Sequence, residues 1–161
     1  MMQAVVITVS DACSQGERED MSGAALTQLL TDLGATIMER KVLSDDLEPL
    51  EEALREFAAR PDVNLIVTTG GTGLGPRDNT PEATRNVIER EAPGLAEAMR
   101  AESLKVTKMA MISRGVCGVR SGTLIINLPG SPKAVQESFA VIAPVLSHAL
   151  DLLAGHTAHS A

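Results

Sequence analysis

The chain has 161 residues, of which 44% are hydrophobic and 22% are charged, and this size and balance predict one compact domain, residues 1–161, with a core of its own. The net charge of −7, with no Trp or Tyr and only two Phe, argues against a nucleic-acid partner, because single strands bind in basic grooves with stacking aromatic side chains. Apolar runs such as residues 4–7 and 123–128 are too short to cross a membrane, and residues 1–9 lack the basic start of a signal peptide, so we expect a cytoplasmic protein with no membrane partner.

Short apolar runs rich in β-branched residues predict three strands in the first part of the chain. They lie at residues 3–9, 36–43 and 63–68. After the first strand, residues 10–21 form a polar loop, and the apolar residues from Ser22 onward recur at helical spacing as far as Gly34, which is placed to end the helix. Asp46 is a candidate N-cap for a second helix whose apolar face extends to Phe57.

The rest of the chain continues this alternation and adds one antiparallel excursion. Further helices are expected to begin at Thr80-Pro81, near Pro93 and at Ser131-Pro132, and the last one runs to about Leu153. A capping residue followed by proline at the first helical position is a typical helix start. Residues 116–128 predict a short strand, a turn and a second strand. Strands that alternate with helices predict an α/β fold, a three-layer αβα sandwich with a mostly parallel sheet.

Ligands of such folds bind at the carboxyl ends of the parallel strands. In this chain three loops follow strand ends, after Val9, after Thr68 and after Leu128. In the second of these loops, the glycines of residues 70–73 let the backbone turn sharply and present N–H groups to an anion. The alternative is that these glycines only make a tight connection between a strand and a helix.

Two common nucleotide-binding motifs are absent from this loop. A phosphate-binding P-loop needs a lysine after its last glycine, whereas Gly75 is followed by Pro76 and Arg77. A dinucleotide-binding loop needs a glycine three positions after Gly73, and that position is Pro76. The loop is therefore a phosphate-binding candidate of a different kind.

Charged residues next to this loop make it a candidate metal and nucleotide site. Arg77 can neutralise a phosphate, and the start of the following helix supplies N–H donors. Asp78 would repel a bare phosphate, so it either holds a divalent cation or caps that helix. Asp45 ends the second strand, and strand ends gather at one edge, so Asp45 and Asp78 can share one Mg²⁺ with nucleotide phosphates.

Three further groups of polar residues are expected at the same edge. Lys133, in the first turn of the last helix, opposes the helix dipole and therefore suits an anionic ligand, although exposed lysines are common at such positions. Ser10 and Asp11 in the first loop can recognise a polar heterocycle, and Ser113 and Arg114 form a fourth candidate patch.

Several motifs recur in this order and spacing in one known family. They are Val9-Ser10-Asp11, GEREDMSG at residues 16–23, TTGGTG and RDNTPEAT within residues 68–84, Ser113-Arg114-Gly115, RSGTLIIN at residues 120–127 and LPGSPK at residues 128–133. Together they resemble the molybdopterin adenylyltransferase family of the Mog/MoaB type. The resemblance extends from about residue 4 to residue 153.

The resemblance implies an α/β domain that assembles as a homotrimer and transfers AMP from ATP to the terminal phosphate of molybdopterin, with Mg²⁺ as cofactor and pyrophosphate as second product. A downstream molybdenum-insertion protein would receive the adenylylated pterin. The two essential aspartates of the family map to Asp45 and Asp78, although Ser44 stands where the family often has proline.

The remaining site residues are also implied by the resemblance. The nucleotide and phosphate site maps to Gly70, Gly71, Thr72, Gly73, Arg77, Gly130, Ser131, Pro132 and Lys133. The pterin side maps to Ser10, Asp11, Ser113 and Arg114. The alternative is a non-catalytic pterin-binding or carrier protein of the same family, but the intact RDNTPEAT segment favours an enzyme. The motif series disfavours an unrelated phosphate enzyme of similar fold.

Overall fold

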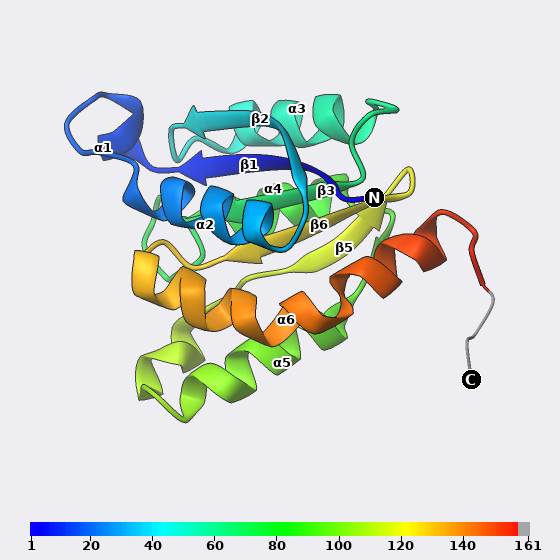
Figure 1. Cartoon of the computed structure of the whole chain (residues 1–161). Coiled ribbons are helices and arrows are strands. Elements are labelled where there is room, and N and C mark those ends of the chain that lie inside the picture. Colours follow the sequence, from blue (N-terminus) through cyan, green and yellow to red (C-terminus); the bar gives the residue numbers. More distant parts are fainter. Residues whose placement is uncertain (158–161) are drawn as a thin grey trace.

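The computed structural model describes residues 1–157, and the strands of this part form one six-stranded sheet (Figure 1). The strands are β1 (Gln3–Val9), β2 (Thr36–Leu43), β3 (Leu65–Thr69), β4 (Arg90–Glu91), β5 (Cys117–Arg120) and β6 (Thr123–Leu128). Their order across the sheet is β2-β1-β3-β6-β5-β4. The first four strands in this order are parallel, whereas β5 is antiparallel to β6 and β4 is antiparallel to β5. The predicted, mostly parallel sheet with one antiparallel excursion is confirmed.

Helices cover both faces of the sheet. They are α1 (Asp11–Ser14), α2 (Met21–Asp32), α3 (Leu47–Ala58), α4 (Thr80–Val87), α5 (Pro93–Leu104), α6 (Pro132–Leu153) and the 3-10 helix η1 (Lys108–Ile112). The helices α2, α5 and α6 pack on one face, and α3 and α4 pack on the other (Figure 1). Successive residues of a strand point to opposite faces, so Val6 joins the first core and Val5 joins the second. The predicted three-layer arrangement is confirmed.

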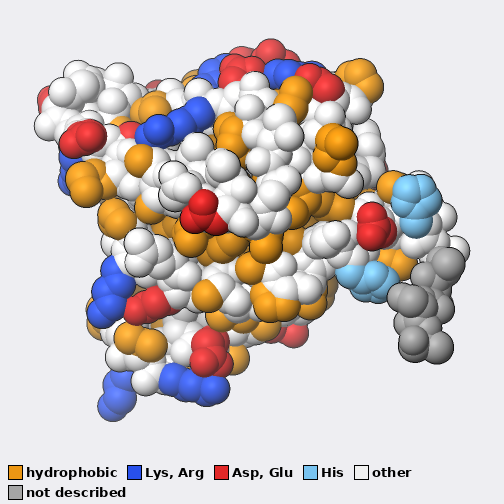
Figure 2. All heavy atoms as spheres, in the orientation of Figure 1, with side chains coloured by type: hydrophobic (Ala, Val, Ile, Leu, Met, Phe, Trp, Pro, Cys, Tyr) orange, Lys and Arg blue, Asp and Glu red, His pale blue; other side chains and the backbone are white. Residues whose placement is uncertain are grey.

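The face of the molecule that Figure 2 shows has no continuous basic stripe. On that face, acidic and basic side chains are scattered among neutral and apolar ones. Among the described residues, no helix is long and apolar enough to cross a membrane.

Two local features near the carboxyl ends of the strands differ from the sequence prediction. Helix α4 has its N-cap at Asn79 and not at Thr80, and the Asn79 side chain makes no cap hydrogen bond. Thr80 is buried, and its hydroxyl donates to the carbonyl oxygen of Gly70 at 2.9 Å, so it joins α4 to the glycine loop and does not cap the helix. The predicted polar loop after β1 contains the one-turn helix α1, which is capped by Ser10.

Candidate functional site

The three loops that follow β1, β3 and β6 meet at one edge of the sheet, as predicted. The N–H of Gly70 donates to the carbonyl oxygen of Leu128 at 3.1 Å. Gly70 has a φ of +98°, and a Cβ on it would lie 2.3 Å from the carbonyl oxygen of Val9. A Cβ on Gly130 would lie 3.3 Å from the Cα of Gly70. The backbones are thus close enough that only glycine fits at residue 70.

An open pocket of about 610 Å³ lies at this edge. Eight of the site residues predicted from the sequence line this pocket: Ser10, Asp45, Gly70, Gly71, Asp78, Gly130, Ser131 and Pro132. Four other predicted nucleotide-site residues, Thr72, Gly73, Arg77 and Lys133, do not line the pocket. The loops and the two aspartates are therefore brought together, whereas the predicted basic residues lie beside the pocket.

The two aspartates each present one unused carboxylate oxygen. Asp45 Oδ2 accepts a hydrogen bond from the N–H of Asp11 at 2.9 Å, and Asp11 Oδ1 accepts one from the N–H of Asp45 at 3.1 Å. Asp78 Oδ2 accepts from the N–H of Gly75 at 2.9 Å, so Asp78 fixes its own loop and does not cap α4. In residues 1–157, the Oδ1 atoms of Asp45 and Asp78 accept no hydrogen bond from the protein.

The electrostatics of Asp45 favour a cation at this place. Burial raises the pKa of the Asp45 carboxyl, and the negative charges of Asp11 and Asp78 act in the same direction. The part of the chain that the structure describes contains no group of three or more His, Cys, Asp or Glu able to hold a metal by itself. Two unused carboxylate oxygens fit Mg²⁺ when phosphates and water complete its coordination. The donor set therefore suits a metal that arrives with a nucleotide.

Arg77 forms an ion-pair cluster beside the pocket. Its Nε and Nη2 donate to the two carboxylate oxygens of Asp11 at 2.7 and 2.9 Å, and Nη2 also donates to Asp46 at 3.0 Å. These contacts lower the pKa of Asp11 to about 2, and the Ser44 hydroxyl together with Arg77 lowers the pKa of Asp46. Asp46 is at the N-cap position of α3 but makes no side-chain cap bond, contrary to the prediction. Of the guanidinium nitrogens of Arg77, only Nη1 has no partner among the described residues, so that nitrogen is the donor left for a phosphate.

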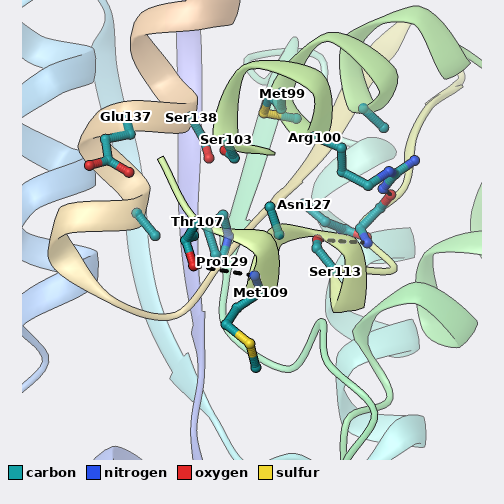
Figure 3. Close-up of a pocket in the computed structure, with 14 residues that line it drawn as sticks. Met99, Arg100, Ser103, Thr107, Met109, Ser113, Asn127, Pro129, Glu137 and Ser138 are labelled. Carbon is teal, nitrogen blue, oxygen red and sulfur yellow. Dashed lines mark hydrogen bonds between the residues drawn. The ribbon is translucent and has the colours of Figure 1, made fainter. Parts of the chain in front are cut away.

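Ser113 lies in a second, smaller pocket of about 210 Å³, between α5, η1 and the start of α6 (Figure 3). Met99 and Met109 make part of its wall apolar. Pro129 lines this pocket, whereas the next residue, Gly130, lines the first one. The turn between β6 and α6 therefore separates the two pockets, and the predicted pterin-side residues Ser10 and Ser113 do not share one cavity.

The sequence as a whole matches one protein family. A family model described as a probable molybdopterin binding domain matches residues 5–148. The chain belongs to this family. The resemblance inferred from the motifs is thereby confirmed.

Individual members of the family match nearly the whole chain. The molybdopterin adenylyltransferase of Helicobacter pylori strain J99 is 38% identical over 153 residues, which are 94% of this chain and 87% of that protein. The molybdenum cofactor synthesis protein cinnamon of Drosophila melanogaster is 44% identical over 149 residues, which are 92% of this chain but 25% of that longer protein. The crystal structure of the molybdopterin biosynthesis enzyme MoaB from Thermus thermophilus is 47% identical and has a TM-score of 0.91, with 96% of this chain and 98% of that chain covered.

Within this molybdopterin-binding fold, Arg114 lies behind the glycine loop. Its Nε donates to the carbonyl oxygen of Gly73 at 2.7 Å and its Nη2 to the carbonyl oxygen of Asp78 at 2.8 Å. Its backbone N–H donates to the carbonyl oxygen of Thr72. Its guanidinium also pairs with Glu82, and this contact lowers the pKa of the Glu82 carboxyl. The sequence groups Arg114 with the pterin side and gives Glu82 no role. The only signal for Glu82 is its position in the RDNTPEAT motif.

Lys133 lies on the surface at the start of α6. Ser131 caps this helix as predicted, because its hydroxyl accepts from the N–H of Ala134 at 3.2 Å. The Lys133 side chain is 80% exposed, and its ammonium lies 3.9 Å from Glu137, one helical turn further on. The lysine thus lies outside the pocket wall, and its role as a counter-charge for the ligand stays a prediction.

Asn127 is a buried residue that joins the site to the core. Its side-chain N–H groups donate to the hydroxyls of Thr68 at 3.1 Å and Thr84 at 3.0 Å, and its side-chain oxygen Oδ1 accepts from the backbone N–H of Val116 at 3.0 Å. It therefore links β6 to β3, to α4 and to the segment that enters β5. In the sequence, only its position at the end of the RSGTLIIN motif singles out Asn127.

Proposed function

We propose that this chain is a molybdopterin adenylyltransferase of molybdenum cofactor synthesis. An oxygen of the terminal phosphate of molybdopterin attacks the α-phosphorus of ATP, the bond from that phosphorus to the bridging oxygen breaks, and pyrophosphate leaves. The observation that carries the proposal is the pair Asp45 and Asp78, each with an unused carboxylate oxygen, beside a glycine loop in one pocket. The name of the Helicobacter pylori relative, aligned over 94% of this chain, supports it.

Asp45 and Asp78 are the residues that would hold Mg²⁺. Bound there with ATP, the ion would offset the negative charge of the phosphates. Without a cation, the charges of Asp45 and Asp78 would repel the same phosphates, and a bound cation would remove this repulsion.

The backbone next to the aspartates is arranged to hold a phosphate. Gly71 lines the pocket, and its N–H has no acceptor in the described part of the chain. The N–H of Gly70 is already used by Leu128, so it fixes the loop and leaves Gly71 as the donor. A donor that is fixed before the substrate arrives stabilises developing charge without the cost of reorganisation.

The pterin ring of molybdopterin is assigned to the pocket of Ser113. Apolar walls from Met99 and Met109 suit the faces of a flat heterocycle, and the hydroxyl of Ser138 has no protein partner among the described residues. Because only the turn at residues 129–132 separates the pockets, a pterin there can direct its phosphate toward the nucleotide. We further propose a homotrimer in the cytoplasm whose product passes to a molybdenum-insertion protein.

The proposal is tested by incubating the protein with ATP, Mg²⁺ and molybdopterin and measuring adenylylated pterin and pyrophosphate. The wild-type protein should form both products in equal amounts. Asp78→Asn should reduce turnover on the order of a hundredfold or more, because an amide keeps the bond to Gly75 but is a poor Mg²⁺ ligand. Asp32→Asn, an exposed aspartate at the end of α2, is the matched control and should be fully active.

Two outcomes would contradict the proposal. A wild-type protein that binds molybdopterin and ATP but releases no pyrophosphate would be a carrier. Normal turnover by Asp78→Asn would remove the metal role of that residue. Circular dichroism of each variant shows whether a loss of activity is a loss of folding.

A further inference from the structure

The start of α2 forms part of the wall of the pocket that contains Asp45 and Asp78. Met21 and Ser22, its first two residues, line this pocket together with Ser131 and Pro132 at the start of α6. In Figure 1 both helices begin at the side of the molecule where β1 ends. The helices have 12 and 22 residues, and the N-terminal end of each carries partial positive charge from its free N–H groups. The GEREDMSG motif thus brings a helix start to the pocket.

Ser22 presents polar atoms that the protein does not use. The residue is only 8% exposed, and its hydroxyl makes no hydrogen bond with any described residue. In residues 1–157 every fully enclosed side-chain nitrogen or oxygen has a partner, so this unpaired hydroxyl is reached by solvent, and Ser22 lines the pocket. Its N–H also has no acceptor in the described part of the chain, whereas the next two N–H groups of α2 donate to Asp20. A hydroxyl and an N–H on one residue are therefore both free to donate.

The position of Ser22 is fixed by close packing of the first turn of α2 against β1. A Cβ on Gly23 would lie 2.2 Å from Oδ2 of Asp20 and 2.3 Å from Oγ1 of Thr8. The Thr8 hydroxyl itself donates to Oδ2 of Asp20 at 2.7 Å. Glycine at residue 23 thus permits a contact that no other residue would allow, and this contact holds Ser22 at the pocket wall.

The nearby carboxylate of Asp20 does not prevent an anion from binding. Its Oδ1 accepts from Gly23, and its Oδ2 accepts from Thr8 and forms a salt bridge with Arg40 at 3.0 Å. Beside Asp45 and Asp78, the lining includes one further acid and one base, Glu19 and Arg18, whose formal charges cancel. At the start of α2, the groups left to meet an anion are therefore the helix terminus and its unpaired donors, and a cation at Asp45 and Asp78 would offset the charges of those two carboxylates.

We infer that Ser22 and the N-terminal turn of α2 form a second phosphate-binding subsite in this pocket. Its ligand is a terminal phosphate group, which the Ser22 hydroxyl and N–H bind together, apart from the metal site of Asp45 and Asp78. The identity of the ligand rests on the proposed function, since that reaction offers two sources: the β- and γ-phosphates of ATP, or the phosphate of molybdopterin.

Calorimetric titration with inorganic pyrophosphate, ATP and AMP at constant Mg²⁺ tests the subsite directly. Ser22→Ala should weaken the binding of pyrophosphate and ATP about tenfold or more and leave AMP unchanged, because it removes one hydrogen bond to a charged group. If only the KM for molybdopterin rises, the subsite holds the phosphate of the acceptor. Ser147→Ala, an exposed serine on α6, is the control and should bind all ligands as the wild type does.

Ser22→Asp separates a binding role from a structural one. A carboxylate near the start of a helix interacts favourably with the helix dipole, so the Tm should not fall, yet the negative charge should abolish binding of the phosphate ligand that Ser22→Ala weakens. Unchanged binding of pyrophosphate, ATP and molybdopterin by Ser22→Ala, or normal binding of all three by Ser22→Asp, would overturn the inference. If pyrophosphate binding depends on Ser22 but the wild type makes no adenylylated pterin, the subsite stands and the proposed function fails.

Discussion

Replacing Asn127 by alanine removes the amide that joins β6 to β3, α4 and the segment before β5. The N–H of Val116 then has no acceptor in a buried position, and the hydroxyls of Thr68 and Thr84 each lose a donor. A buried N–H without a partner costs about 1–3 kcal/mol and each of the two other lost hydrogen bonds about 1 kcal/mol, so the free energy of unfolding should fall by about 3–5 kcal/mol. For a chain of this size the Tm should fall by about 10 °C.

Thermal and urea unfolding followed by circular dichroism measure this loss. Thr84→Val, which removes one of the three partners, should cost about 1 kcal/mol. The double variant should lose less than the sum of the two single losses, because both changes break the same hydrogen bond. A Tm of Asn127→Ala within about 2 °C of the wild-type value, or full additivity with Thr84→Val, would show that the amide does not hold these elements together.

Two further changes separate stability from activity. Asp45→Asn should lose turnover, yet in urea unfolding at pH 7 it should be more stable than the wild type. Because the pKa of Asp45 in the folded protein is raised above its ordinary value of 3.8, ionising this carboxyl opposes folding at neutral pH. The stability advantage of the variant should therefore shrink as the pH falls through the folded-state pKa toward 3.8. Equal stability of both proteins at pH 7 would contradict this. Arg114→Lys should lower kcat by about tenfold or more in steady-state assays and leave the KM for molybdopterin unchanged, because the Arg114 guanidinium holds the carbonyls of Gly73 and Asp78. A rise only in that KM would instead place Arg114 on the pterin side.

The sequence predicts the architecture well because its signals are local. Apolar runs such as residues 3–9 are short and β-branched, helices start at proline, and glycine follows strand ends, so each element can be recognised without its neighbours. The prediction for the N-cap of α4 is wrong for the opposite reason. The Thr80 hydroxyl has a better acceptor in the carbonyl of Gly70, which only the tertiary structure brings near.

The site is predictable as far as strand order alone determines it. Asp45 and Asp78 follow from the rule that parallel strands end at one edge, and both line the pocket. The partners of long basic side chains do not follow, because a guanidinium reaches groups far away in sequence. Arg77 donates to Asp11 and Arg114 donates to the glycine loop, and no spacing in the sequence predicts either contact.

The turn between β6 and α6, which separates the two pockets, has a consequence for the order of events. Thr69 fixes this turn through a hydrogen bond of 2.7 Å to the carbonyl oxygen of Pro129. Under the proposed function each substrate occupies one side, and the product is a single molecule that lies across the turn. Such a product is a bivalent ligand, held at both ends with a high effective concentration, so it dissociates more slowly than either substrate. Joining the substrates would thus also retain the product until another protein collects it.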